Sequence, residues 1–468
     1  MNGDLLASEP AARGAGRDLH AVRSAWRPSR RQDAQVGGGL VVLLAWLLAA
    51  PGLAQAPVAW RELAGATATA VGVLFGEGLD DDPAGRSGLA AVTAAARLER
   101  GRKGGAPLLA SGVKVGADYA LVFCVVAADQ HDRAAAFVDA VRGGGAALTD
   151  DALEILIARA ALAADDAEFL YPGDVLMTRA RRRLADDAAR ARPPLGRASE
   201  CSELRPADIR RHLESATPQR LAVLGAVSAA WRSAFEAMDL ASGSCPPRGD
   251  VVFTAPSTAL PVTQDSSDRA DSPYVGAAFP APPAARRAAF ALGLEVAKAR
   301  AFRGMKLRGR ELFARAPFVR WSWLEAEPIV MFYRRGEDPV ALLPGQRRKA
   351  SVADEVAATR RELEALLADL RDRPPSGAEL AAARALLLSS VALPGPDERA
   401  EWVTEPATYP GRLQAMLLAA HHGVDAAAVS AATKADVAEV VRAALAPANT
   451  SWHVIAPRER ARFGFRRR

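Results

Sequence analysis

The stretch from Gly78 to Gly101 brings a run of acidic residues up to the start of a helix. The carboxylates of Asp80 to Asp82 are consecutive, whereas a calcium loop spaces its oxygen ligands along the chain. We therefore interpret the acidic run as a solvated turn. Gly88 follows the turn, and the Ala-rich segment Leu89 to Arg100 is predicted to form a helix with little chemistry on its surface.

Histidines and cysteines offer few other candidates for chemistry. None of the six His residues stands at a metal-ligand spacing from acidic residues, and His421-His422 ends a predicted helix, where a cation is favourable. Cys124 lies in an apolar run and is interpreted as a buried thiol. Cys201 and Cys245 lie in polar surroundings, where they either form a disulfide or remain free. The phosphate loop, dinucleotide and nucleophile-elbow motifs are absent from the sequence.

Length and charge limit the class of protein. A chain of 468 residues exceeds what one hydrophobic core usually supports, so two domains are expected. The formal charge of +6 comes from the ends, because residues 1–56 carry six Arg against four acids and the tail from Arg458 carries six Arg against one Glu. The remaining body is near neutral, which argues against a nucleic-acid partner.

The N-terminal segment has the order of an export signal. Arg30-Arg31 precede the apolar run Leu40 to Ala50, and small residues up to Ala56 follow. The run is shorter than the about 20 apolar residues of a spanning helix, so we predict a cleaved signal, with an uncleaved anchor as the alternative. The mature protein would then be periplasmic or secreted, without a stable membrane span.

The remainder of the chain uses one pattern of elements twice. Each half begins with an apolar strand and a small-residue helix, continues with further strands and helices, and closes with a strand. This predicts an α+β fold of two similar domains, each an antiparallel-rich sheet with helices packed on one face. The expected divisions are a signal (1–56), a first domain (57–241), a linker (242–273), a second domain (274–457) and a basic tail (458–468).

Landmarks along nearly the whole mature chain resemble the insulinase-like metallopeptidases, the M16 family of pitrilysin and mitochondrial processing peptidase. The strand before the acidic turn and the Gly88-Leu89-Ala90 helix start are similar to the segment that leads into the zinc helix of that family. Further similar segments follow in the same order: Gly116 to Tyr119, Pro206 to Ile209, Leu221 to Gly225, Val429 to Val441, Ala446 to Asn449 and Val454 to Pro457.

The resemblance implies a zinc site whose ligands this sequence lacks. The family's H-x-x-E-H motif places two imidazoles at i and i+4 on one helical face, with a Glu that activates water. The matching positions here are Ala91, Ala94 and Ala95, and methyl groups neither bind metal nor transfer protons. The third ligand would fall near Leu162 to Ala164, and the nearby Asp165 and Glu168 would have no histidine partners.

The second domain of the family often carries an Arg and a Tyr that hold the substrate. Arg308 is the best candidate for the Arg, whereas Phe313 or Phe318 stands closest to the Tyr position and cannot donate a hydrogen bond. We therefore expect an inactive relative without metal or cofactor. Because family members commonly work as pairs, it would serve as a non-catalytic partner of an active M16 peptidase acting on peptides. A stand-alone peptide-binding or scaffold protein is the alternative.

Overall fold

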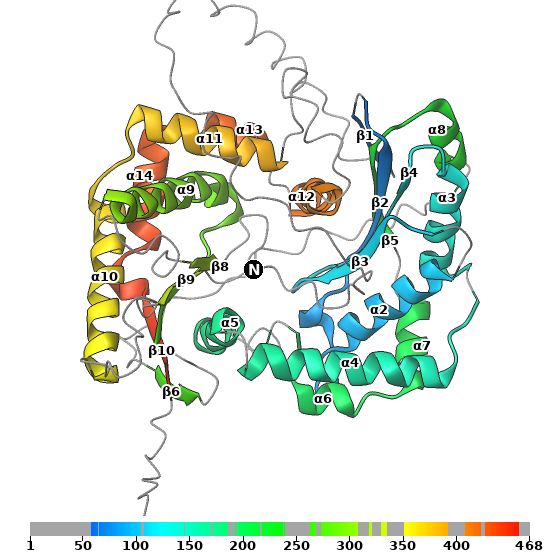
Figure 1. Ribbon diagram of the computed structural model, residues 1–468, viewed down its shortest axis with the longest axis horizontal. Helices are drawn as coiled ribbons and strands as arrows, with labels where there is room; N and C mark the ends of the chain where they lie inside the picture. The colour runs from blue at the N-terminus through cyan, green and yellow to red at the C-terminus, as the bar shows by residue number, and fades with distance from the viewer. Residues whose placement is uncertain are drawn as a thin grey trace, which may run out of the picture. The chain divides into compact units, whose positions relative to one another are not determined.

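The computed structural model describes residues 58–457, apart from positions 64, 104–106, 145, 170–171, 186–191, 194, 216–217, 237, 239–262, 268–272, 308–317, 321–328, 335–350, 392–407 and 423–425. All described residues belong to the unit Pro57–Arg468 (Figure 1). Within it, two five-stranded sheets are each combined with helices, which confirms the predicted α+β class. None of the described helices is both long enough and apolar enough to span a membrane.

The first sheet, sheet A, has the strand order β1-β5-β2-β4-β3. Its pairs are antiparallel except for β1 and β5, which run parallel. Apolar residues fill both faces of β2 and β4, and both strands are buried over almost their whole length, as is typical of strands covered on two sides. The strands are β1 (Val58–Glu62), β2 (Ala68–Phe75), β3 (Ala110–Val115), β4 (Ala120–Ala127) and β5 (Pro218–Gly225).

Helices of the first half pack on one face of sheet A. Helix α2 contacts β3 and β4, and α3 contacts β2 and β4. Their apolar side chains meet residues such as Val71, Val122 and Val223 in one core cluster. The elements of this half are η1 (Leu79–Asp81), α2 (Leu89–Arg102), α3 (His131–Asp139), η2 (Ala140–Gly144), α4 (Asp150–Phe169), α5 (Pro172–Leu184), α6 (Ala198–Ser202), α7 (Pro206–Ser215) and α8 (Ala229–Glu236).

Sheet B in the second half repeats this topology strand for strand. Its order is β6-β10-β7-β9-β8, with the parallel pair again at one edge, between β6 and β10. The remaining pairs are antiparallel, as in sheet A. The sequence pattern that appeared twice therefore corresponds to one supersecondary unit used twice. The strands are β6 (Thr263–Ser267), β7 (Tyr274–Phe279), β8 (Phe318–Arg320), β9 (Ile329–Arg334) and β10 (Ser451–Pro457).

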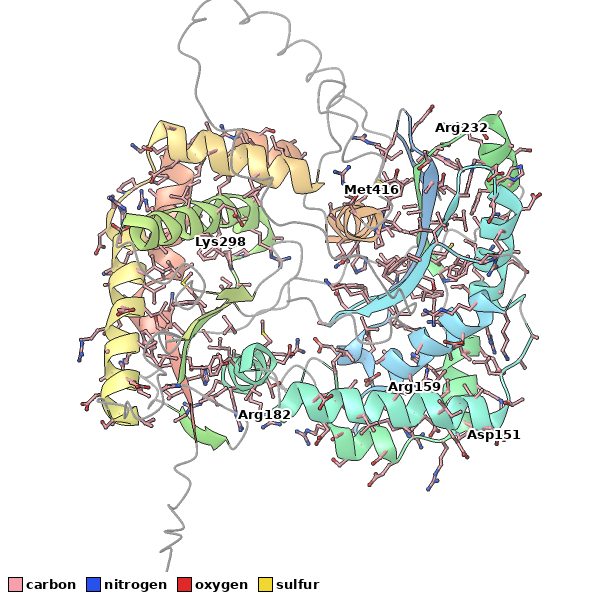
Figure 2. The ribbon with its side chains drawn as sticks, viewed as in Figure 1. Asp151, Arg159, Arg182, Arg232, Lys298 and Met416 are labelled. Atoms are coloured by element: carbon pink, nitrogen blue, oxygen red, sulfur yellow. The ribbon has the colours of Figure 1, made fainter. Side chains whose placement is uncertain are left out.

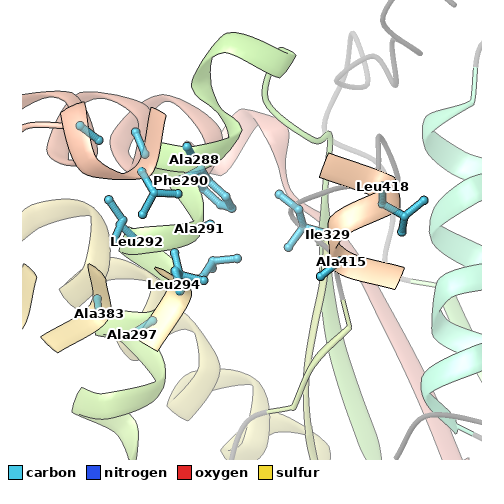
Figure 3. Close-up of a cluster of buried hydrophobic side chains, with 14 of the residues drawn as sticks. Ala288, Phe290, Ala291, Leu292, Leu294, Ala297, Ile329, Ala383, Ala415 and Leu418 are labelled. Carbon is cyan, nitrogen blue, oxygen red and sulfur yellow. The ribbon is translucent and has the colours of Figure 1, made fainter. Parts of the chain in front are cut away.

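Helices of the second half surround a large apolar core. Phe290 and Leu294 of α9 pack with Ile329 of β9, and Ala415 and Leu418 of α12 belong to the same cluster (Figure 3). The elements are α9 (Ala284–Leu307), α10 (Val352–Asp372), α11 (Gly377–Val391), α12 (Tyr409–His422), α13 (Ala426–Ala431), α14 (Lys434–Ala444) and η5 (Pro447–Asn449).

The two halves exchange one helix each. Helix α12 of the second half contacts β2, β4 and β5 of sheet A, and α5 of the first half contacts β7, β9 and β10 of sheet B. Close approach of α12 depends on Gly72, because a Cβ there would lie 2.7 Å from Cδ2 of Leu413. On the other side, Leu176 of α5 packs with Ala278 and Val330. Each sheet is thus covered on its own side by its own helices and on the other by a helix of the other half.

Two features differ from the expected organisation. Strand β6 falls inside the 242–273 stretch expected as a linker, so sheet B begins before Tyr274. Helices cover both faces of each sheet because of the exchange, whereas helices on one face were expected. Helix α5 is one of the two exchanged helices. It was not predicted from the sequence because its many arginines obscure the short row of apolar residues among them. The predicted signal and basic tail lie outside the described residues.

Candidate functional site

Helix α2 starts at a turn that is built around Asp82. Gly88 adopts a left-handed conformation (φ 94°), and a Cβ there would lie 2.3 Å from the Cys201 sulfur, so only glycine fits. The Asp82 carboxylate accepts hydrogen bonds from the backbone N–H groups of Gly88 (2.6 Å) and Ala90 (2.8 Å). Asp82 is therefore the cap of the helix, although it lies six residues before Gly88.

The surroundings of Asp82 are unusually dry for a carboxylate. The side chain is 4% exposed, and burial raises its pKa to about 6, although the two N–H donors favour the charged form and oppose that rise. The Arg192 guanidinium donates to the backbone carbonyl of Asp82. The acidic run is thus a turn, but it is not the solvated turn that was predicted, since Asp82 is buried and the Asp80 side chain is 10% exposed.

The turn is also tied to the helix that crosses to sheet B. Asp80 forms an ion pair with Arg181 of α5 at 2.6 Å, and the Arg181 side chain is 1% exposed. Arg181 also donates to the carbonyl of Arg192 at 2.9 Å. Sequence reasoning missed this pair because Asp80 and Arg181 lie 101 residues apart.

Ala91, Ala94 and Ala95 all lie in α2, as predicted. Ala91 is half-buried, whereas Ala94 and Ala95 are 0% and 3% exposed, and Ala94 packs in the core cluster with Phe75 and Leu98. These methyl groups do not fit a zinc ion, because they supply no lone pair to a metal. Among the residues that the structure describes, no group of three His, Cys, Asp or Glu side chains could hold a metal ion.

The predicted region of the third ligand lies on α4, which contacts α2. Leu162 is exposed, Ala163 and Asp165 are half-buried and Ala164 is buried. The side chain of Glu168 is outside the described residues, and so is Arg308 of the second half. The structure therefore brings the region of the third ligand and the alanine positions onto neighbouring helices, and the substrate-binding role of Arg308 stays a prediction.

Both described cysteines are free and buried. Burial raises the pKa of the Cys124 and Cys201 thiols to about 12, so neither is a reactive thiolate at neutral pH. The Cys201 thiol donates to the carbonyl of Ser87 at 3.1 Å and thereby supports the turn before α2. Cys245 lies outside the described residues, so a Cys201–Cys245 bridge remains a prediction without structural support.

The polar face of α2 was not recognised from the sequence. Arg97 is 2% exposed, and its guanidinium carbon lies 3.8 Å from the centre of the Phe75 ring. Glu77 follows the same strand, and its Oε2 lies 3.0 Å from Nε2 of His212 on α7. The available signal was the spacing of Thr93, Arg97 and Arg100, which places three polar residues on one face of an otherwise Ala-rich helix.

Comparisons with known proteins support the fold. No family model matches the chain, and no match is found among curated proteins. An M16 peptidase inactive domain from Pseudomonas fluorescens has a TM-score of 0.63 at 15% identity, covering 86% of this chain and 96% of that one. The first half of the periplasmic protease PqqL from Escherichia coli has a TM-score of 0.57 at 12% identity, with 86% and 90% covered.

A chain of Complex III2 from Candida albicans is similar as well, with a TM-score of 0.60 at 15% identity, covering 85% of this chain and 93% of that one. Against the whole of PqqL, the present chain spans 44% of the length. At these identities the likeness concerns the fold. The chain has the two-sheet fold of M16 peptidases and M16-like domains, as the sequence resemblance indicated.

Proposed function

We propose that this protein is a catalytically inactive M16-like subunit that partners an exported zinc peptidase acting on peptides. The observation that carries the proposal is a preserved two-sheet fold whose α2 presents packed alanines where the resemblance places the zinc ligands and the catalytic Glu. The fold would be retained for its surface and its partner, since these methyl groups can perform no metal-assisted hydrolysis.

The organisation of a solved neighbour supports the partner role. This chain covers 90% of the first half of PqqL but 44% of the whole protease, so the matching fold is one half of a larger assembly there. We infer that this chain takes a similar half position and that the other half supplies the zinc. That other half would contain the H-x-x-E-H motif and would bind peptides together with this one.

Co-purification tests the partner role. The tagged chain is isolated from its own cells, and companions are identified by mass spectrometry. We expect a companion with an H-x-x-E-H helix and peptide hydrolysis only when both chains are present. A monomer that binds peptides without such a companion would instead favour the stand-alone binding or scaffold function. One zinc per chain in the isolated protein, lost together with hydrolysis on chelation, would overturn the inactive assignment.

Export is tested separately, on the mature protein. Signal cleavage after Ala54 or Ala56 predicts a mass that lacks the first 54 or 56 residues and recovery from the periplasm or medium. Recovery of the uncleaved chain from the membrane fraction would support the anchor alternative, and recovery from the cytosol would contradict both.

A further inference from the structure

The buried arginines of the described structure differ in the hydrogen bonds that their guanidinium groups form. Arg181 donates to Asp80, Arg287 to the carbonyl of Pro282 and Arg300 to Glu379. Arg97 is as deeply buried as these, yet in the described part of the chain its Nη2 has no hydrogen-bond partner. A buried donor without a partner is rare and costly in free energy, so it calls for an explanation.

Two neighbours of Arg97 on the same helix face share this property. Oγ1 of Thr93 and Nε of Arg100 are also buried without a hydrogen-bond partner among the described residues. Thr93, Arg97 and Arg100 stand at i, i+4 and i+7, which places them along one stripe of α2. The three alanines discussed above lie away from this stripe, so it is distinct from the implied zinc position.

Charges of both signs lie around the stripe. Burial lowers the pKa of Arg97 to about 10, while the Glu77 carboxylate acts to raise it and the nearby Arg100 cation acts to lower it. Burial also lowers the pKa of Arg100, and the Glu214 carboxylate of α7 opposes that fall. Neither carboxylate is hydrogen-bonded to Nη2 of Arg97 or Nε of Arg100 in the described structure, so both donors remain available to the oxygens of a small anion.

Helix α7 lies beside α2 near the Arg100 end of the stripe. Helix α2 contacts α7, and the two lie side by side in Figure 1. The Glu77 and His212 side chains at the rim are 29% and 15% exposed, and Arg100 is half-buried. The Arg100 side chain is thus more accessible to solvent than that of Arg97, which is 2% exposed.

We propose that Thr93, Arg97 and Arg100 form a binding site for a small oxyanion between α2 and α7. Its ligand is a phosphate or a carboxylate group, because guanidinium and hydroxyl donors recognise the oxygens that both groups present. Arg97 provides the buried charge, Thr93 closes the inner end and Arg100 binds from the rim. The site is independent of the proposed partner role.

Thermal unfolding and calorimetry of the mature chain test the site with two probes at constant ionic strength, inorganic phosphate and acetate. We expect a saturable rise in melting temperature with at least one probe, with sodium chloride as the reference salt. Arg97→Gln and the milder Arg100→Gln should each weaken binding about tenfold or more. Arg159→Gln, an exposed change on α4 (Figure 2), is the matched control and should leave binding unchanged.

The two probes distinguish the sources of the ligand. Saturation by phosphate alone would indicate a phosphorylated ligand, and saturation by acetate would indicate a carboxylate. Equal stabilisation of the native chain and Arg100→Gln would mean an adventitious ion only and would overturn the proposal. Absence of a saturable effect in the native chain would also overturn it, because water would then fill the site. Arg100→Gln keeps the test decisive should Arg97→Gln fail to fold.

Discussion

Helices α2 and α9 occupy equivalent places in the two sheets, since each follows the central strand of the repeated topology, β2 or β7. Both are Ala-rich, and each buries an arginine. Arg300 of α9 binds Glu379 through two hydrogen bonds of 3.0 Å and also donates to the carbonyls of Arg373 and Pro374. Arg97 of α2 rests on a phenyl ring and leaves Nη2 without a partner in the described structure.

This difference separates a structural charge from one that is available to a ligand. The Arg300 guanidinium holds the pKa of Glu379 down to about 2, so the pair remains ionised and links α9 to α11 at any physiological pH. Arg97 is hydrogen-bonded to no carboxylate in the described structure, and the nearby Glu77 acts on it only through its charge. The two helices thus each bury an arginine, which serves cohesion in α9 and, we propose, binding in α2.

Breaking the Arg300 pair should have the largest effect. Glu379→Ala leaves a buried guanidinium without its main partner and is expected to lower the free energy of unfolding by about 3–5 kcal/mol. Urea unfolding followed by circular dichroism measures the change. Lys298→Ala, which removes an exposed pair with Glu295 on the same helix (Figure 2), is the control and should stay within about 0.5 kcal/mol. Similar losses in both variants would contradict a structural role for Arg300.

Restoring a carboxylate at the alanine positions should be the next largest effect. Ala94→Glu places a charge at a 0% exposed site of the core, with an expected loss of about 3 kcal/mol and no gain of zinc. Ala91→Glu, at a half-buried position on the same helix, should lose about 1 kcal/mol or less. Denaturant unfolding and metal analysis of both variants check this. A stable Ala94→Glu protein that binds zinc would show that the site has been kept open.

The two halves should respond to pH with opposite signs. Burial, with Arg183 and Arg179 nearby, lowers the pKa of His453 in β10 to about 4 from 6.5. The unfolded chain therefore binds the proton first, and about 3 kcal/mol of stability is lost as the pH falls from 6.5 to 4. Asp82 has its pKa raised from 3.8 to about 6, so about 3 kcal/mol is lost as the pH rises from 3.8 through 6.

Two neutral variants separate these contributions in unfolding curves measured between pH 4 and 8. His453→Asn should flatten the acid loss, and Asp82→Asn should flatten the loss on the way to neutral pH. The same pH profile in native protein and both variants would mean that neither group sets the pH dependence of stability.

The smallest effect is expected for Arg97 itself. In buffer without phosphate or carboxylate, Arg97→Met removes an unsatisfied buried charge together with its contact to Phe75, and the two changes offset each other to within about 1 kcal/mol. Comparison with Glu379→Ala by the same unfolding measurement then sharpens the contrast between the helices. A loss of several kcal/mol would show that Arg97 holds the fold together as Arg300 does.

Local pattern alone determined much of this protein. Apolar alternation and Ala-rich periodicity located β7 and α10 with their observed bounds, and the repeated order of elements predicted two similar sheets. The same reading placed three alanines on the helix after Gly88, because identity and spacing along one helix are properties of neighbours in the chain.

Only the tertiary structure decided where distant segments meet. The exchange of α5 and α12 between the sheets, the Asp80–Arg181 ion pair and the contact of α2 with α7 join residues that the sequence separates by many positions. Burial of Arg97 follows from that packing, since an arginine in an isolated helix would extend into water. The sequence contains the donors of the proposed oxyanion site, but only packing in the folded chain buries these donor atoms away from water without a hydrogen-bond partner.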